Sequence, residues 1–391
     1  MSGRNVFLTG KAGVGKSYVL EKFINDVQAE EKNVVIVAPT GIAAININGV
    51  TVHRAFKVPI KPLVEDARKI PSTIKEADII VLDEVSMCRM DLFDYISKII
   101  IQASNYRVKY LDKKPIQFIV CGDFFQLPPV LTDKDREILE QHYSRPIDKG
   151  FAFQSEYWSY FDFANIALDE VVRQTDENFI KALNMTREGD TQGLKYFWQH
   201  SSKYAINKAI MLCGTNKAAK DKNEYELGLL KTPENTFIAT VSGDVKESDK
   251  VVEERLLLKV GARVMTVLND TAMRYQNGSL GTIVNITNEF VYVEMDDSGQ
   301  TVEIERASWD IKDYILEKGK IKQKTVGTYI QFPLKLAYAI TIHKSQGQTY
   351  DAVNLNPYCW DCGQLYVALS RVRSIDKLFI TQYPSDRFLV T

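Results

Sequence analysis

Short apolar runs alternate with segments of helical periodicity along the first part of the chain. The runs end in turns and lie at residues 5–9, 33–38, 79–82 and 116–121. Strands that alternate with helices in this way predict a parallel sheet covered by helices. A second set of strands is expected to begin near residues 165–168, continue at 209–213 and close at 377–381. The pattern therefore predicts an α/β fold with two similar modules.

The pattern changes between residues 256 and 332, where runs of valine, isoleucine and threonine replace helical periodicity. Turn-forming pairs such as Asn277-Gly278 and Lys318-Gly319 interrupt these runs. This region is predicted to form a small antiparallel barrel inserted in the second module. In the first module, residues 57–71 carry three prolines and mixed charge, and we expect them to form a surface insertion rather than part of the core.

Length and composition indicate a multidomain protein without a membrane segment. At about 100 to 200 residues per domain, two or three domains are expected in a chain of 391 residues. No apolar run reaches the roughly 18 residues that a membrane helix requires. The N-terminus lacks the charged and long apolar regions of a signal peptide. We therefore expect an intracellular protein, cytoplasmic in a bacterium and nuclear or mitochondrial in a eukaryote.

Charge and cysteine content narrow the possible partners. The formal net charge of −1 argues against coating of nucleic acid by bulk charge, although it leaves room for a local groove. Five cysteines, scattered and odd in number, argue against a disulfide framework. Cys359 and Cys362 form a C-x-x-C pair with no further metal ligands nearby, so we interpret them as incidental thiols rather than a zinc site.

A phosphate loop is the first chemical motif. The sequence GKAGVGKS at residues 10–17 follows a predicted strand and precedes a helical pattern at 18–27. Its glycines allow backbone N–H groups to turn toward phosphate oxygens at a helix N-terminus. Lys16 would reach the β- and γ-phosphates and Ser17 would ligate magnesium. The residues predicted to bind the nucleotide here are Gly10, Ala12, Gly13, Val14, Gly15, Lys16 and Ser17.

Two carboxylates and an amide follow the next strands. Asp83 and Glu84 end the apolar run 79–82, at the sheet edge where ligands bind. Asp83 is predicted to hold the magnesium shell and Glu84 to polarise the attacking water. Gln126 follows the run 116–121, and its amide could contact the γ-phosphate or the water, although it could also be an ordinary loop amide.

Two arginines are candidates for neutralising charge on the γ-phosphate. Arg173 follows the run 165–168, and Arg371 lies in a predicted helix, LYVALSRVR, at 365–373. A planar, permanently charged guanidinium suits this role. Spacing alone leaves a second interpretation open, in which either residue is a surface arginine with a solvated head.

Taken in order, the motifs resemble those of superfamily 1B helicases and specifically the Pif1 family. The matching segments are GKAGVGKS (motif I), APTGIAA at 38–44 (motif Ia), LDEVSM at 82–87 (motif II) and GDFFQLPPV at 122–130 (motif III). Residues 91–98 are similar to the signature element of the family. The later motifs are matched at Arg173-Gln174, Thr215-Asn216, 341–347 and 366–373, and those of the inserted barrel at 261–265 and 277–281.

The resemblance covers nearly the whole chain and implies a domain organisation. It implies two RecA-like modules in tandem, a small wedge-like insertion in the first and an SH3-like β-barrel in the second. The expected boundaries are 1–168 for the first module with its insertion at about 57–75, 169–260 with 331–391 for the second module, and 261–330 for the barrel.

The resemblance also implies an activity. It implies ATP- and Mg²⁺-dependent translocation along single-stranded DNA from 5′ to 3′, opening duplex, RNA–DNA hybrid or quadruplex structures. The expected context is DNA replication, repair, recombination or telomere maintenance. The expected partners are single-stranded DNA and junctions between single and double strands, and the free protein is expected to be a monomer.

Site residues follow from the same resemblance. Arg173 and Arg371 become sensors of the γ-phosphate, and Gly347 joins the nucleotide-binding set. Hydroxyls, amides and lysines suit backbone phosphates, and rings suit bases, although Phe56 could belong to the core and His53 could cap a turn. The expected DNA-binding residues are Pro39, Thr40, Gly41, His53, Phe56, Pro128, Thr215, Asn216, Asn277, Thr341, His343 and Lys344.

One departure and several alternatives remain. Only residues 1–4 precede the first predicted strand, so the upstream glutamine that contacts adenine in this family has no counterpart, and either the chain is trimmed or adenine selectivity is weak.

A nucleotide kinase would share the phosphate loop but would need neither a second module nor the distal arginine helix. A DNA clamp without enzymatic activity is a further class, and RNA is the closest rival substrate.

Overall fold

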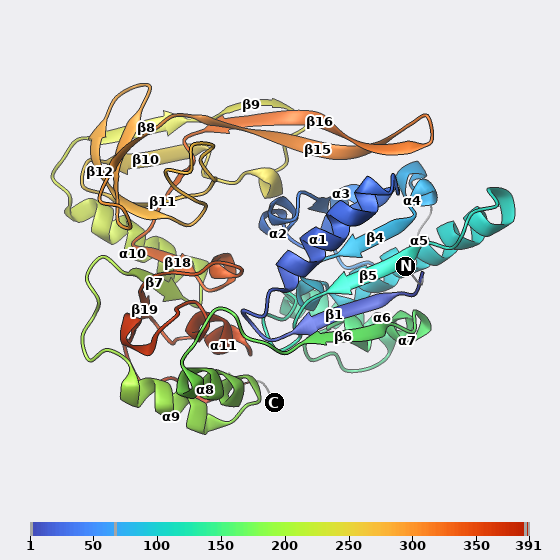
Figure 1. The fold of residues 1–391 in the computed structure, drawn as a ribbon, viewed down its shortest axis with the longest axis horizontal. Helices are drawn as coiled ribbons and strands as arrows, with labels where there is room; N and C mark the ends of the chain where they lie inside the picture. Colours follow the sequence, from blue (N-terminus) through green and yellow to red (C-terminus); the bar gives the residue numbers. More distant parts are fainter. Residues whose placement is uncertain (1–2, 66–68, 387–388, 390–391) are drawn as a thin grey trace. The chain divides into compact units, whose positions relative to one another are not determined.

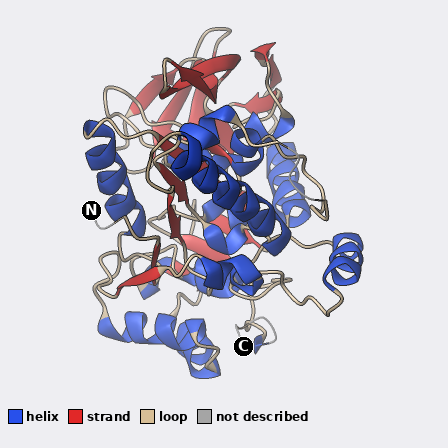
Figure 2. Cartoon of the chain, turned by 90° about the vertical axis from the view of Figure 1, so that its right-hand side faces the viewer, coloured by secondary structure: helices blue, strands red, loops and turns tan. Residues whose placement is uncertain are grey.

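The computed structural model describes residues 3–65, 69–386 and 389. Residues 66–68, within the predicted insertion of the first module, therefore lie outside the described part. The chain divides into two compact units, one formed by Met1–Arg173 with Lys312–Lys324 and the other by Gln174–Ile311 with Thr325–Thr391. Figures 1 and 2 show the helices and strands of the described residues. Within the described residues, no helix combines the length and apolarity needed to cross a membrane.

The first unit is built on a parallel sheet of six strands in the order β3-β2-β4-β5-β1-β6. The apolar runs β2 and β4 are buried along their whole length, as expected for central strands covered on both faces. The strands are β1 (Val6–Gly10), β2 (Val34–Ala38), β3 (Val50–Thr51), β4 (Ile79–Leu82), β5 (Gln117–Cys121) and β6 (Ala164–Leu168). The predicted parallel sheet is confirmed.

One strand joins a different sheet from the one that the apolar pattern predicts, although it lies within the boundary at residue 168 that the family resemblance implies. Residues 165–168 were expected to begin the second series of strands, but β6 pairs in parallel with β1 along its whole length. Gly10 explains the close fit, because a Cβ there would lie 2.4 Å from the carbonyl oxygen of Leu168. Apolar strands of similar composition do not reveal which sheet they join, since that is decided by tertiary pairing.

Helices cover both faces of this sheet. Alternate residues of the strands point to opposite sides, so Val34, Ile36 and Val81 pack with helix α1 while Val35, Val37 and Leu82 pack with α5. The helices of the unit are α1 (Lys16–Ala29), α2 (Gly41–Asn46), α3 (Val52–Phe56), α4 (Ser72–Glu76), α5 (Met90–Tyr110), α6 (Asp133–Tyr143) and α7 (Glu156–Tyr160), with short 3₁₀ turns at Val85–Met87 and Ala152–Gln154.

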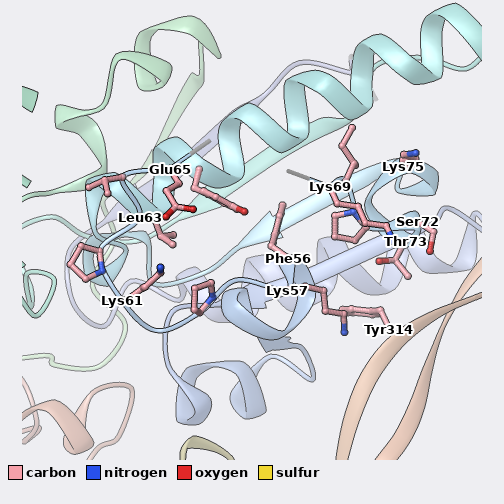
Figure 3. A pocket seen from close by; sticks show the side chains of 16 residues that line it. Phe56, Lys57, Lys61, Leu63, Glu65, Lys69, Ser72, Thr73, Lys75 and Tyr314 are labelled. Carbon is pink, nitrogen blue, oxygen red and sulfur yellow. The ribbon is translucent and has the colours of Figure 1, made fainter. Parts of the chain in front are cut away.

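The insertion after α3 lies mostly on the surface, as predicted, but two of its apolar side chains reach the core. Val58 and Leu63 are buried in the cluster around α5, and the Leu63 N–H donates to the Asp91 carboxylate at 2.8 Å. Figure 3 shows the cavity of about 730 Å³ between this segment, α4 and Tyr314, with several lysines at its rim. The prolines shape the segment, but two apolar side chains anchor it.

A hairpin from far along the chain completes the first unit. It is the tip of strands β15 (Ala307–Glu317) and β16 (Lys320–Gln331). Strand β3 pairs with β2 at Val37 and Ala38. At Ile36, one residue earlier in β2, the Tyr314 hydroxyl takes the place of a strand partner. It accepts from the Ile36 N–H at 3.0 Å and donates to the Ile36 carbonyl at 3.3 Å. Asn33 holds the turn of the hairpin through Gly319 and Ile321.

The second unit contains a parallel sheet of four strands in the order β18-β7-β19-β20. The strands are β7 (Ile210–Cys213), β18 (Ala339–Thr341), β19 (Val353–Leu355) and β20 (Leu378–Ile380). The helices are α8 (Glu177–Arg187), α9 (Thr191–His200), α10 (Asn216–Leu229) and α11 (Gln364–Leu369), with 3₁₀ turns at Glu247–Asp249, His343–Ser345 and Ile375–Lys377. This confirms the prediction of a second α/β module.

The region rich in valine, isoleucine and threonine forms antiparallel sheets. Strands β11 (Arg263–Thr266), β12 (Leu280–Ile286), β13 (Val291–Met295), β14 (Thr301–Ile304) and β17 (Leu334–Leu336) form one sheet in the order β14-β13-β12-β11-β17. Smaller sheets pair β8 (Glu234–Ile238) with β10 (Arg255–Lys259), and β9 (Thr240–Gly243) with β16. Inward residues such as Leu258, Val264 and Phe332 form a common core. Closure into an SH3-like barrel stays a prediction.

Candidate functional site

The predicted phosphate loop connects β1 to α1. Gly10, Gly13 and Gly15 have φ angles of 146°, 81° and 83°, which residues with a side chain rarely adopt. Among the described residues, no side chain caps α1 and no acidic residue lies in its first turn. The N-terminal N–H groups and the helix dipole are therefore suited to an anion such as phosphate.

Lys16 closes over this loop. Its ammonium donates to the carbonyl oxygens of Gly10 at 2.8 Å and of Lys11 at 3.0 Å. These contacts hold the positive charge above the loop, where the predicted β- and γ-phosphates would lie. Ser17 follows at the exposed start of the helix.

Asp83 and Glu84 follow β4 directly, and Glu84 has a constrained conformation. Asp83 is 7% exposed, and its Oδ1 accepts from the Glu84 N–H at 2.9 Å. Burial raises the pKa of Asp83, while the Glu84 N–H, the Cys121 thiol and Lys16 act in the opposite direction. Glu84 has a φ of 50°, a left-handed conformation that is strained for a residue with a side chain and typical of functional sites.

Cys121 lies beside Asp83, although no sequence motif indicates a role for it. It ends β5, the strand that pairs with β4, and its thiol hydrogen-bonds to the Asp83 carboxylate. Burial, followed by the charge of Asp83, raises the pKa of the thiol, so it is a neutral donor. Its place opposite Asp83 in two adjacent parallel strands was the signal that could have identified it.

Gln126 is held by Asp123 in the turn after β5. The Gln126 side-chain amide donates to Asp123 Oδ2 at 3.2 Å, and its backbone N–H donates to the Asp123 carbonyl at 2.9 Å. Both residues are buried. Asp123 was also missed by the sequence interpretation, and it fixes the orientation of the predicted sensor amide.

The donor set fits a magnesium ion. A buried carboxylate, Asp83, and the hydroxyl of Ser17 are hard oxygen donors, which Mg²⁺ prefers. The described part of the chain holds no cluster of three or more His, Cys, Asp or Glu residues suited to a metal. Phosphate and water usually supply the other ligands of this ion in phosphate-binding sites.

Arg173 ends the first unit close to the phosphate loop. The N–H of the preceding residue, Val172, donates to the Gly13 carbonyl at 2.9 Å, which ties this segment to the loop. The next residue, Gln174, belongs to the second unit, where its amide donates to the carbonyls of Ser370 and Val372 at 3.2 and 2.9 Å.

Arg371 is buried, so the interpretation of it as a solvated surface arginine is wrong. It is 2% exposed and lies just beyond α11 rather than within it. Its guanidinium donates to the carbonyls of Val367 at 2.8 Å and Ser345 at 3.1 Å. It therefore joins the segment after α11 to the polar cluster at 341–347.

The predicted strand-binding residues of the first unit differ in exposure. Pro39, Thr40 and Gly41 are partly exposed after β2, and Thr40 caps α2 by accepting from the Ala43 N–H at 3.3 Å. His53 is partly exposed on α3, where Thr51 is the capping side chain. Phe56 is 2% exposed in the core and Pro128 is also buried. The Phe56 ring is therefore a core residue here, which was the alternative to base stacking.

In the second unit, sheet register brings the predicted strand-binding segments together. Thr341 of β18 pairs in parallel with Cys213 of β7, so both segments end at one edge of the sheet. Beyond that edge, Thr215 caps α10 by accepting from the Ala218 N–H at 3.1 Å, and Asn216 is exposed. Thr341 is buried, and its hydroxyl accepts from the Lys344 N–H at 3.4 Å.

The remaining predicted residues lie near this edge. The Asn277-Gly278 turn approaches the end of the 341–347 cluster, because a Cβ on Gly278 would lie 2.6 Å from Gln348 Oε1. Gly347 is exposed, with a φ of 79°. Burial lowers the pKa of His343, with Asp361 opposing. Burial and the charge of Lys344 lower the pKa of Lys335 to about 8.

Comparisons with known proteins identify the family that this chain resembles. A family model described as PIF1-like helicase matches residues 1–195, and one described as UvrD-like helicase C-terminal domain matches residues 336–374. The chain is 30% identical to the ATP-dependent DNA helicase Pif1 of Campylobacter jejuni, and the alignment covers 96% of this chain and 88% of the relative.

Solved structures are similar over almost the full length. Pif1 from Bacteroides sp in complex with ADP-AlF4 is 32% identical, with a TM-score of 0.83, and the match covers 99% of this chain and 90% of that one. Bacteroides Pif1 bound to single-stranded DNA has the same identity and a TM-score of 0.67, over 99% of this chain and 91% of that one.

Proposed function

Because the chain belongs to the PIF1-like helicase family, we propose that it is an ATP-dependent DNA helicase that moves from 5′ to 3′ along single-stranded DNA. The observation that carries this proposal is the sheet edge of the second unit, where Cys213 and Thr341 are paired and the polar segments that follow them meet. A nucleotide kinase has no need of such an edge. The proposed substrates are DNA duplexes, RNA–DNA hybrids and quadruplexes entered from a single-stranded tail.

The proposed domain organisation follows the family. Residues 1–168 form the first motor domain, with a wedge-like insertion at about 57–75. Residues 169–260 and 331–391 form the second motor domain, and residues 261–330 form the SH3-like barrel, apart from the hairpin tip Lys312–Lys324, which belongs to the first unit. The DNA-bound state of a relative supports the proposed partner. We further infer that the free protein is a monomer and that it acts inside the cell, where its substrate is found.

The nucleotide site is proposed to work through fixed positive and negative charges. The loop Gly10–Ser17 and Lys16 hold the triphosphate, and Ser17 and Asp83 hold Mg²⁺. The ion, when bound, neutralises charge that develops on the transferred phosphate. Glu84 takes the proton of the attacking water, and Gln126, oriented by Asp123, contacts the water or the γ-phosphate.

Arg371 is proposed to link hydrolysis to grip on the strand. Its guanidinium bonds to Ser345 and Gln348 in the strand-binding segment. A guanidinium drawn toward the γ-phosphate gives up these bonds, so the 341–347 segment changes its hold on DNA. Arg173 is proposed to contact the same phosphate from the segment tied to Gly13. Alternating grip of the two motor domains then advances the strand.

An unwinding assay tests this function. The protein is mixed with duplexes that carry either a 5′ or a 3′ single-stranded tail, with ATP, with GTP or without nucleotide. We expect strand separation only with a 5′ tail and a hydrolysable nucleotide. Unwinding from 3′ tails alone, or nucleotide hydrolysis that single-stranded DNA does not stimulate, would contradict the proposal. A strong preference for ATP over GTP would exclude weak adenine selectivity.

A further inference from the structure

A large aromatic side chain lies at the strand-binding edge of the second unit without having been assigned a role. Trp360 is in the segment between β19 and α11, and it is 44% exposed. Its ring stacks on His343, with centroids 5.7 Å apart and planes 13° apart. Its indole N–H donates to the Gly214 carbonyl at 2.8 Å. It therefore touches both of the segments that carry the predicted strand-binding residues.

The tryptophan is held rigidly. A Cβ on Gly214 would lie 2.3 Å from the Tyr358 carbonyl oxygen, so the two backbones are in direct contact and only glycine fits there. The Trp360 backbone N–H donates to Gln364 Oε1 at 3.3 Å, and the neighbouring Cys359 is buried. An aromatic ring fixed in this way loses little conformational entropy when a ligand covers it.

Groups suited to a phosphate backbone surround the ring. Thr215 and Asn216 follow Gly214 directly, and Lys344 follows His343, with Asn216 and Lys344 exposed. Lys335 and Lys344 are close enough for the charge of one to lower the pKa of the other. The acidic neighbour, Asp361, is buried. Rings beside cations and amides are the arrangement with which proteins hold single strands, through base stacking and backbone contacts.

We propose that Trp360 stacks on a nucleobase of the bound single strand and that His343 supports the ring from the opposite face. This inference rests on the proposed function and assigns one of its base contacts. The stacking contact of Trp360 does not depend on which base is present, because every base presents a ring face.

A matched pair of tryptophans provides the test. Trp198 on α9 is 42% exposed and contacts Tyr383 edge-on, so Trp198→Ala controls for the loss of an exposed indole. The affinity of each variant for a fluorescently labelled oligo-dT strand is measured at fixed salt. We expect Trp360→Ala to weaken binding by about tenfold and Trp360→Phe by about two- to threefold, while Trp198→Ala binds as the parent protein does.

A strand with abasic positions separates stacking from a merely structural role. If Trp360 stacks on a base, the difference between the parent protein and Trp360→Ala shrinks on an abasic strand of the same length and charge. An equal loss on both strands would show that the ring only positions its loop, and it would overturn the proposal.

Intrinsic fluorescence gives a readout that does not depend on affinity. Stacking quenches indole emission, so saturation with oligo-dT is expected to quench the parent protein and Trp198→Phe but not Trp360→Phe, whose melting temperature checks its fold. Unchanged quenching in Trp360→Phe would overturn the inference while leaving the helicase proposal standing. Failure of the parent protein to bind any single strand would instead refute the proposed function, and this inference with it.

Discussion

The proposed nucleotide site of the first unit and the proposed strand edge of the second unit are built in opposite ways. Asp83 and Gln126 are buried and fixed by bonds to their near neighbours in sequence. The strand edge is more exposed, and it joins Gly214, His343 and Trp360 from three distant segments. Bond-breaking chemistry needs fixed geometry and little water, whereas a sliding strand needs accessible contacts that can be released. The difference predicts that the two sites respond differently to mutation.

The largest expected effect separates the two sites outright. Lys16→Ala removes the ammonium held above the phosphate loop, and we expect it to reduce ATP turnover by about 10²- to 10³-fold. Affinity for single-stranded DNA without nucleotide should stay within about twofold, because Lys16 bonds within the phosphate loop and is not among the residues expected to bind DNA. Turnover and DNA binding are measured on the same preparation. Parallel loss of both activities would show that the sites are not separable.

A second prediction concerns the charge that the strand edge carries. The pKa of Lys335 is lowered from 10.5 to about 8 by burial and by Lys344, so replacing it with an apolar side chain should relieve this penalty. We expect Lys335→Met to raise the free energy of unfolding at pH 7 by about 1–3 kcal/mol, measured by denaturant titration. Lys22→Met, at an exposed position of α1, is the control and should change little.

The pH dependence of the free energy of unfolding provides a second test of the lowered pKa of Lys335. Between pH 8 and 10.5 the unfolded chain keeps the Lys335 proton that the folded protein has released. The contribution of Lys335 to stability therefore rises with pH across this window, and its penalty is fully present below pH 8. Subtracting the profile of Lys335→Met should isolate this rise. A flat difference between the two profiles would contradict it.

A smaller effect is expected for the hydroxyl that completes the first sheet. Tyr314→Phe keeps the ring in the core and leaves the Ile36 N–H and carbonyl without the hydroxyl. We expect a loss of about 1 kcal/mol in the free energy of unfolding, measured by denaturant titration. Tyr292→Phe, which removes a hydroxyl from β13 in the second unit, is the matched control. Equal losses of free energy of unfolding in the two variants would show that the hydrogen bonds to Ile36 stabilise the fold no more than the Tyr292 hydroxyl does.

The smallest predicted effect tests how finely the nucleotide site is positioned. Cys121→Val substitutes a slightly larger apolar side chain and removes the thiol donor to Asp83, and it should raise the magnesium concentration for half-maximal turnover by about threefold. Cys121→Ser retains a donor and should lie closer to the parent protein. If the serine variant is as impaired as the valine variant, the thiol acts through packing rather than through its hydrogen bond.

The local geometry of the proposed nucleotide site could be predicted from sequence better than that of the proposed strand edge, for a physical reason. A phosphate loop and a strand ending in Asp83-Glu84 are local motifs, so spacing dictates which groups meet. Cys121 and Asp123 were missed because their roles depend on pairing between strands and on turn geometry. Trp360 was missed because the register of β18 and β7 and the backbone contact at Gly214 decide its place. Burial decided between open alternatives for Phe56 and Arg371.

The Tyr314 contact has a consequence for how the protein is synthesised. The first unit is contiguous up to Arg173, but its sheet is completed only by a hairpin about 140 residues further along. At about 5–20 residues per second, a ribosome needs roughly 7 to 28 s to add that stretch. During this interval the nascent first unit has β2 without its hydroxyl partner and a core without the Tyr314 ring. Chaperones that bind nascent chains would meet the first unit in this incomplete state, and its release from them should coincide with emergence of the hairpin.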